Sequence, residues 1–146
     1  MQLRNPSRVS REQIESVRNM FNSFHHVAII CSDYARSKRF YVEILGLEVV
    51  REIYRDDRKS FKLDLRVGDK SQIELFSFPN PPARVSNPEA CGLRHIAFEV
   101  EDVSDIAQKL SARGVDIEPI RVDEATHKTF TFFKDPDGLP IELYQK

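Results

Sequence analysis

Two histidines and two glutamates recur in matching settings along this chain of 146 residues. His26 and His95 each lie in a short apolar run, and Glu74 and Glu142 each follow an isoleucine and precede a leucine. The offset from His26 to His95 differs by one position from the offset from Glu74 to Glu142. Two imidazoles and two carboxylates make a competent site for a divalent first-row metal, with Ni²⁺ or Zn²⁺ as the first candidates and Co²⁺ or Mn²⁺ as further ones.

The residues around each glutamate indicate where its side chain points. Successive side chains of a strand point to opposite faces, so Glu74 and Glu142 are expected to face away from their aliphatic neighbours. One histidine in an apolar strand is more often a hydrogen-bonded core residue than a ligand, and a glutamate in a strand usually faces solvent. Because both residue types repeat together inside apolar runs, where a charge needs a partner, the metal hypothesis is favoured.

An internal repeat determines the expected architecture. Each copy begins with a strand, continues with a helix and closes with three strands, which predicts an α+β fold of two tandem βαβββ modules. The first copy is predicted to contain strands 24–31, 47–54, 60–67 and 72–78, with a helix capped by Ser32 or Asp33 and ended by Gly46. The second is predicted to contain strands 93–100, 115–122, 128–133 and 139–144, with a helix capped by Asp102 or Ser104 and ended by Gly114.

Four segments follow from this pattern. Residues 1–23 form an N-terminal tail and a short helix that begins with the capping-box pair Ser10 and Gln13 and packs on the body or on a partner chain. Residues 24–146 form the main domain, with module one at about 24–79 and module two at about 93–146. The proline-rich stretch at about 80–92 is the predicted linker, because proline blocks both helices and strand pairing.

Composition excludes several classes of partner. With 22 Lys and Arg against 23 Asp and Glu, the net charge is −1, so neither a nucleic acid nor a membrane surface is expected to bind. The apolar run Val27–Cys31 is far too short to span a bilayer, and we expect a cytoplasmic protein. Cys31 and Cys91 form no CxxC pair and are expected to be free thiols.

Several motifs resemble those of one known superfamily. The runs HHVAII, FYVEILGLEVV, IELFSF, RHIAFEV and FKDPDGLPIELYQ are similar, in order and in residue type, to the vicinal oxygen chelate superfamily of glyoxalases, bleomycin-resistance proteins and dioxygenases. The resemblance covers about residues 24–145. It implies a curved mixed sheet built by the two modules around a metal cleft, commonly in a homodimer with a small-molecule substrate. By motif position it also implies His26, Glu74, His95 and Glu142 as metal ligands.

Within that superfamily, the ligand order His, Glu, His, Glu most resembles glyoxalase I (lactoylglutathione lyase). The resemblance implies a metal-dependent lyase or isomerase that moves a proton between adjacent carbons of a small α-oxo or α-hydroxy carbonyl compound, or of its thiol adduct, through a metal-bound enediolate. Glu142 is the expected principal base, and Glu74 a ligand and second proton carrier. The alternatives are an antibiotic-type small-molecule binding protein of the same fold and an iron-dependent dioxygenase.

Two positions depart from glyoxalase I. Ile30 and Phe78 stand where those enzymes typically have the Arg and Asn that contact glutathione, so the metal and proton-transfer chemistry is expected to be retained, whereas the use of glutathione as the thiol is left open. Candidate substrate-binding residues are Phe76, Phe130, Phe132 and His127, with Phe78 as a further pocket wall and Arg66, Arg94, Arg121 and Lys128 as further cations. Core packing for the rings and solvation for the charges are the alternatives. The pairing of the modules, within one chain or between two, is left open.

Overall fold

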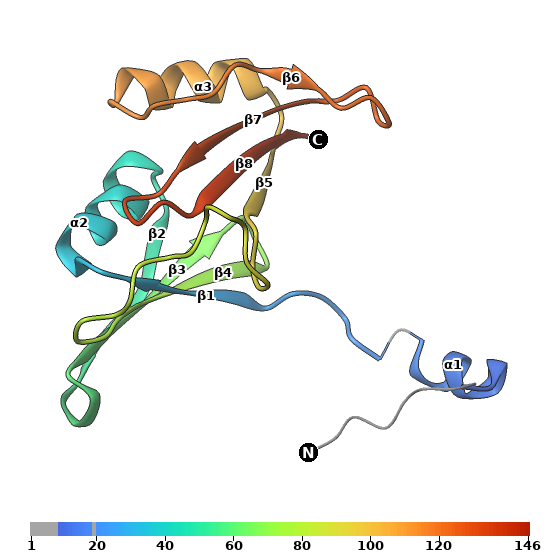
Figure 1. The fold of residues 1–146 in the computed structure, drawn as a ribbon, viewed down its shortest axis with the longest axis horizontal. Helices are drawn as coiled ribbons and strands as arrows, with labels where there is room; N and C mark the ends of the chain where they lie inside the picture. The colour runs from blue at the N-terminus through green and yellow to red at the C-terminus, as the bar shows by residue number, and fades with distance from the viewer. Residues whose placement is uncertain (1–8, 19) are drawn as a thin grey trace.

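Two four-stranded mixed sheets form the body of the protein (Figure 1). The computed structural model describes residues 9–18 and 20–146. In spatial order the first sheet contains β1 (His26–Cys31), β4 (Ser71–Ser77), β3 (Ser60–Val67) and β2 (Glu48–Arg55), and the second contains β5 (Ile96–Val100), β8 (Pro140–Gln145), β7 (Thr129–Lys134) and β6 (Arg121–Val122). In each sheet the first pair of strands is parallel and the others are antiparallel.

One helix connects the first two strands of each module. In the first module this helix is α2 (Tyr34–Arg39), which continues as the π-helical turn η1 (Phe40–Ile44). In the second module it is α3 (Val103–Ala112). The carboxylate of Asp33 accepts a hydrogen bond from the Arg36 amide at 3.0 Å, and that of Asp102 accepts one from the Asp105 amide, also at 3.0 Å. The βαβββ order of both modules confirms the predicted α+β fold.

The segment before β6 departs from the predicted strand 115–122. Only Arg121–Val122 pairs as a strand, with β7. Pro119 has no amide proton to donate, and the segment is held to β7 by two other bonds instead. The Glu118 amide donates to the Phe132 carbonyl at 2.9 Å, and the Thr131 hydroxyl donates to the Glu118 carbonyl at 2.7 Å.

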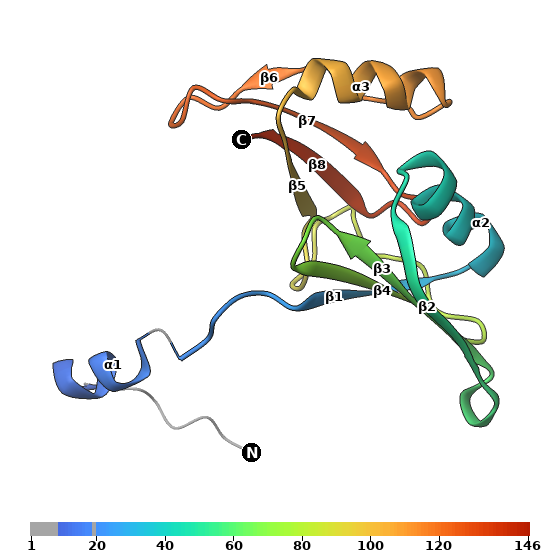
Figure 2. The ribbon, with the colours of Figure 1, turned by 180° about the vertical axis from the view of Figure 1, so that it is seen from behind.

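The N-terminal helix α1 (Arg11–Val17) lies apart from both sheets in Figures 1 and 2. Its predicted capping box is confirmed, because the Ser10 amide donates to Gln13 Oε1 at 2.9 Å and the Gln13 amide donates to Ser10 Oγ at 3.2 Å. Ile14 and Val17 are exposed, so the helix does not pack on the body of its own chain. In the described part of the chain no helix is both long and apolar enough to cross a membrane.

A single core is shared by the two modules. Leu63, Leu65, Ile73 and Leu75 of the first sheet belong to the same buried cluster as Ile141 and Leu143 of the second. The ring of Phe40, at the end of α2, lies 6.3 Å from that of Phe133 in β7. The helix of the first module therefore packs against the second module as well as its own sheet.

A buried hydrogen bond also joins the modules. The Tyr41 hydroxyl donates to Asp135 Oδ2 at 2.9 Å, and Asp135 Oδ1 accepts from the amides of Asp137 and Leu139 at 2.9 and 2.8 Å. Burial raises the pKa of Asp135 in spite of these bonds. In this turn Gly138 has a φ of +84°, a left-handed conformation that favours glycine.

Each sheet has a second face that points away from the shared core, which we name its open face. Strand alternation puts Lys62, Asp64 and Glu74 on the open face of the first sheet, opposite to Leu63, Leu65 and Leu75. Glu142 and Phe132 occupy the open face of the second sheet in the same way. The open faces carry the predicted metal ligands.

Candidate metal centre

The first pair of predicted ligands lies at the edge of the first sheet. His26 Nε2 of β1 is 3.6 Å from Glu74 Oε2 of β4. The other carboxylate oxygen, Oε1, is 2.8 Å from Lys62 Nζ, so Glu74 is held from the side opposite to the histidine. His25 contacts His26 through the two Nδ1 atoms at 2.9 Å, which leaves Nε2 of His26 turned toward Glu74. These contacts present one imidazole nitrogen and one carboxylate oxygen together.

The second pair repeats this arrangement on the second sheet. His95 Nε2 is 3.1 Å from Glu142 Oε2. Arg94 Nη1 lies 3.3 Å from His95 Nδ1, and the same guanidinium is paired with Glu89 at 2.8 Å. Arginine can only donate, so this contact favours the tautomer of His95 with its proton on Nε2, where it donates to Glu142. A metal bound at Nε2 would replace that proton.

The strand register explains why the two pairs match. Ala28 lies directly beside Glu74 in the parallel pair β1 and β4, and Ala97 lies beside Glu142 in β5 and β8. A small residue at this position leaves the glutamate side chain room above the neighbouring strand. The sequence repeat is therefore also a repeat in space.

A single chain does not bring the two pairs together. The two sheets share no hydrogen-bonded strands. Within residues 9–18 and 20–146 no group of three or more His, Cys, Asp or Glu side chains could hold a metal ion. The sequence-based expectation that His26 meets His95 and Glu74 meets Glu142 is not realised inside one chain.

The two pairs differ in their surroundings. Across the sheet from Glu74 lies Asp64, whereas Phe132 lies across from Glu142. Asp64 is 2.9 Å from Lys62 Nζ and accepts two hydrogen bonds from Arg51, at 3.0 and 2.7 Å. Burial disfavours the charged form of Asp64, but the bonds from Lys62 and Arg51 outweigh it and lower the pKa of Asp64. The carboxylate of Glu74 in turn raises the pKa of Lys62.

Aromatic rings surround the second pair. The ring of Phe132 meets that of His95 edge to face at a centroid distance of 5.2 Å, and the ring of Phe130 lies 6.1 Å beyond it. Both rings line a cleft of about 550 Å³ together with His95 and Glu142. The first ligand pair thus lies in a charged network and the second beside an apolar wall.

The other predicted substrate residues are less uniformly placed. Phe76 lies two residues beyond Glu74 on the same face, and its ring stacks on that of Phe78 at 6.0 Å. His127 lies in the loop between β6 and β7, where its amide donates to the Asp123 carbonyl at 2.8 Å, and it is not among the residues that line the cleft of Glu142.

The further cations are mostly paired with carboxylates. Arg66 is paired with Glu48 at 3.5 Å, Arg94 with Glu89 at 2.8 Å and Arg121 with Glu118 at 2.9 Å, and Lys128 lies in the same loop as His127.

Two residues of the open face were missed by the sequence interpretation, namely Lys62 and Arg55. Lys62 shares its face with Asp64 and Glu74, and the alternation in Phe61-Lys62-Leu63-Asp64-Leu65 was a signal that could have shown it. The Arg55 guanidinium carbon lies 4.9 Å from the centre of the Phe76 ring and 5.5 Å from that of Phe78. Its place depends on the pairing of β2 with β3, which the sequence does not specify.

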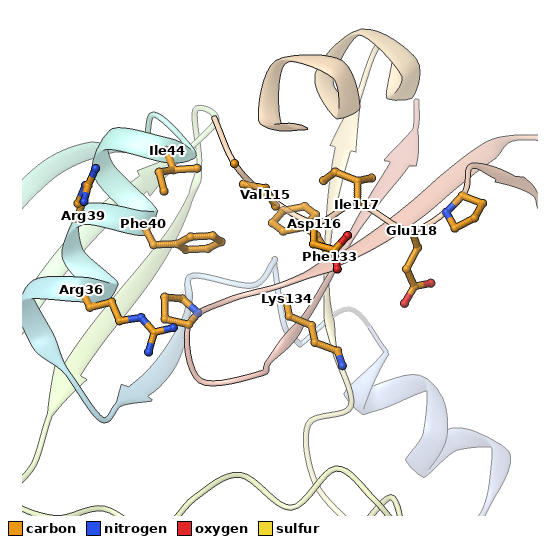
Figure 3. A pocket seen from close by; sticks show the side chains of 13 residues that line it. Arg36, Arg39, Phe40, Ile44, Val115, Asp116, Ile117, Glu118, Phe133 and Lys134 are labelled. Atoms are coloured by element: carbon orange, nitrogen blue, oxygen red, sulfur yellow. The ribbon is translucent and has the colours of Figure 1, made fainter. Parts of the chain in front are cut away.

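A separate cleft of about 660 Å³ lies where the two modules meet (Figure 3). Arg36, Phe40 and Ile44 line it from the first module, and Ile117 and Phe133 from the second. None of the four predicted metal ligands is among its lining residues. It shares Glu118, Phe133 and Lys134 with the cleft beside Glu142.

The donor chemistry of the two pairs fits a divalent metal. Each pair offers an imidazole nitrogen and a carboxylate oxygen that already point at one another, and both glutamates are only 12–14% exposed. Neutral imidazole and carboxylate are ligands suited to zinc, nickel and related metals. A complete set of four ligands requires one pair from each kind of sheet.

Comparison with known proteins gives close relatives. The chain is 54% identical over 127 residues to the uncharacterized protein YwkD of Bacillus subtilis (strain 168), covering 87% of this chain and 99% of that protein. It is 56% identical to the uncharacterized protein YaeR of Escherichia coli (strain K12), covering 84% and 95%. The crystal structure of a glyoxalase family protein from Enterococcus faecalis matches with a TM-score of 0.80 and 50% identity, covering 86% and 98%.

More distant relatives carry names that state an activity. They include the lactoylglutathione lyase GLX1 of Arabidopsis thaliana, 27% identical and matched over 84% of this chain and 44% of that protein. A manganese-dependent 2,3-dihydroxybiphenyl 1,2-dioxygenase of Geobacillus genomosp. 3 is 32% identical over 83% of this chain and 36% of that protein. The family model for the Glyoxalase/Bleomycin resistance protein/Dioxygenase superfamily matches residues 23–143. With the paired modules and the repeated His and Glu positions, these matches show that the chain belongs to this superfamily.

Proposed function

We propose that this protein is a metal-dependent lyase or isomerase of the glyoxalase I type, acting on a small α-oxo or α-hydroxy carbonyl compound or its thiol adduct. The observation that carries the proposal is the repeated pair of His Nε2 and Glu Oε2 atoms, 3.6 Å apart on the first sheet and 3.1 Å apart on the second. The family includes a relative named as a lactoylglutathione lyase, which supports the same class of reaction.

The proposed active form is a homodimer. Within the described residues the two pairs do not come together as one group of ligands, so the His26 and Glu74 pair needs a His95 and Glu142 pair from a second chain. In a twofold-symmetric dimer, the first sheet of each protomer would meet the second sheet of the other protomer, because an isologous interface uses the same surfaces of both protomers. Each dimer would then hold two metal sites, each with two imidazoles and two carboxylates.

The protein's own residues have distinct proposed roles. The metal, Ni²⁺ or Zn²⁺ with Co²⁺ or Mn²⁺ as further candidates, would act as a Lewis acid that stabilises negative charge on the substrate oxygens. Glu142 takes the proton from the substrate carbon and returns it to the adjacent carbon. Lys62 at 2.8 Å keeps Glu74 in place, which suits Glu74 better to ligation than to proton transfer.

The test separates metal binding from proton transfer. Metal-free protein is reconstituted separately with nickel, cobalt, zinc and manganese and assayed for lactoylglutathione formation from methylglyoxal and glutathione. In parallel, NMR follows deuterium exchange from D₂O into enolisable α-oxo compounds. We expect one metal to support proton transfer, His95→Ala to lose it, and Glu142→Gln to keep the metal while slowing turnover by about 10²–10⁴-fold.

Two results would redirect the proposal. Full turnover in metal-loaded Glu142→Gln would refute the role of Glu142 as the base. Tight binding of small molecules without any exchange would favour the antibiotic-type binding protein, and oxygen uptake with Fe(II) and a catechol would favour the dioxygenase. The predicted cytoplasmic location stays a prediction.

A further inference from the structure

Arg55 stands out among the cations on the open face of the first sheet. Arg51 is paired with Asp64 at 2.7 Å, Lys62 with Glu74 at 2.8 Å, and Arg66 with Glu48 at 3.5 Å. Arg55 has no carboxylate partner among the residues that the structure describes, and its one hydrogen bond runs from Nη2 to the Ser60 hydroxyl at 2.8 Å. It is therefore a positive charge without a counter-charge on the face that carries a ligand pair.

The side chain of Arg55 is held in place rather than free in solvent. Its guanidinium carbon lies 4.9 Å from the centre of the Phe76 ring and 5.5 Å from that of Phe78. Its Nε is buried without a hydrogen-bond partner, and Ser60, which anchors Nη2, is fully buried. A guanidinium fixed on aromatic rings loses little conformational freedom when it binds an anion, because its position is set beforehand.

The position of Arg55 relative to the ligand pair suits a small substrate. Phe76 follows Glu74 by two residues on the same face of β4, which places it about 7 Å farther along the strand. Phe78 is the second ring under Arg55, so the two rings together hold the cation beyond Glu74 in the direction of β4.

We propose that Arg55 binds an anionic group, a carboxylate or a phosphate, at the far end of the substrate, so that the substrate is an anionic α-oxo or α-hydroxy carbonyl compound. This inference rests on the proposed function, since the oxygens at the other end of the substrate would lie at the metal. On the second sheet Arg121 also lies over an aromatic ring, 5.0 Å from the Phe130 ring centre, but Glu118 at 2.9 Å already neutralises it. The anion site is accordingly assigned to the first module.

The test compares compounds that carry an anionic group at the far end with analogues that lack this distal charge. The 5-methyl ester of 2-oxoglutarate keeps its carboxylate at C1, so charged and neutral refer below to the distal group alone. Isothermal titration of metal-loaded protein measures the affinities of dihydroxyacetone phosphate against dihydroxyacetone, and of 2-oxoglutarate against its 5-methyl ester. In at least one pair the charged compound is expected to bind about 10-fold tighter or more, as for a charge-assisted hydrogen bond. The pair that shows the difference identifies the anion as phosphate or carboxylate.

Matched variants show whether Arg55 causes the preference. Arg55→Gln abolishes it while the metal content and the affinity for the neutral compounds are kept, and Arg66→Gln, on the same face, retains it. Arg55→Met keeps an apolar stem over Phe76 and Phe78 and serves as the second variant if Arg55→Gln does not fold.

Three outcomes overturn the inference. In the first, the unmodified protein shows equal affinities within both pairs of compounds or binds neither charged compound. In the second, Arg55→Gln or Arg55→Met keeps the preference for the charged compound unchanged. In the third, Arg66→Gln loses the preference to the same extent as Arg55→Gln. Failure of the proposed function has a different signature, because the neutral compounds would then bind without regard to the metal or to His95→Ala.

Discussion

Mixing two inactive variants tests whether the metal sites lie between protomers. One variant, His26→Ala with Glu74→Ala, removes the ligand pair of the first sheet, and the other, His95→Ala with Glu142→Ala, removes that of the second. Each pair is a close contact within one sheet, at 3.6 and 3.1 Å, so each variant loses one pair and keeps the other. Alone, neither can assemble four ligands, and neither is expected to retain tightly bound metal.

The expected recovery follows from counting the pairs. After subunit exchange about half of the dimers contain one chain of each kind. In these heterodimers one site combines the intact first sheet of one chain with the intact second sheet of the other, and the second site lacks all four ligands. The mixture should therefore bind about one quarter of the metal of the unmodified protein, and purified heterodimers about one half.

The assay is metal content per chain after equilibrium dialysis at limiting nickel or zinc, with heterodimers isolated by two different affinity tags. The control heterodimer pairs an unmodified chain with a chain that carries all four substitutions. In this control both sites lack one pair, so no tight metal is expected. The reverse pattern, with metal in the control and none in the mixed variants, would show that each site lies within one chain and would refute the dimer model.

Four further variants test the packing and the charges of the core. Ile141→Ala, at a fully buried position, is expected to lower the free energy of unfolding in urea by about 2–5 kcal/mol, whereas Ile30→Ala, at a position 56% exposed, changes it by under about 1 kcal/mol; similar losses would contradict the assigned core. Tyr41→Phe leaves Asp135 Oδ2 without its buried donor and should cost about 1–3 kcal/mol, so an unchanged stability would show that this bond contributes nothing. Burial raises the pKa of Asp135 above its ordinary 3.8, so the folded chain holds this proton more tightly than the unfolded chain, and the stabilisation is lost as the pH rises from about 3.8 through the raised pKa. The free energy of unfolding of the unmodified protein minus that of Asp135→Asn should therefore fall over this window, and a rise would contradict the assignment.

The two pairs of His and Glu side chains were predictable because their positions depend on local features. Strand alternation turned Glu74 and Glu142 away from their aliphatic neighbours, and the repeat placed His26 and His95 at equivalent positions. The helix ends also followed from local chemistry, since Asp33 and Asp102 cap their helices through their own carboxylates.

Features that depend on distant contacts were not predictable from the sequence. The contact between Phe40 and Phe133 joins the two modules, and no local pattern reports it. The position of the Arg55 side chain depends on the pairing of β2, β3 and β4. The shortened β6 reflects Pro119 together with tertiary bonds from Thr131 and Phe132, which replaced the strand suggested by the alternation.

The core shared by the modules has a consequence for folding. A fragment ending in the connecting segment 78–95 would lose the contacts of Phe40 with Phe133 and of Tyr41 with Asp135. Because the buried residues of both modules belong to one cluster, the chain is expected to unfold in one cooperative transition rather than module by module. Exchanging one module with that of a relative would succeed only where the side chains at the contact between Phe40 and Phe133 remain complementary.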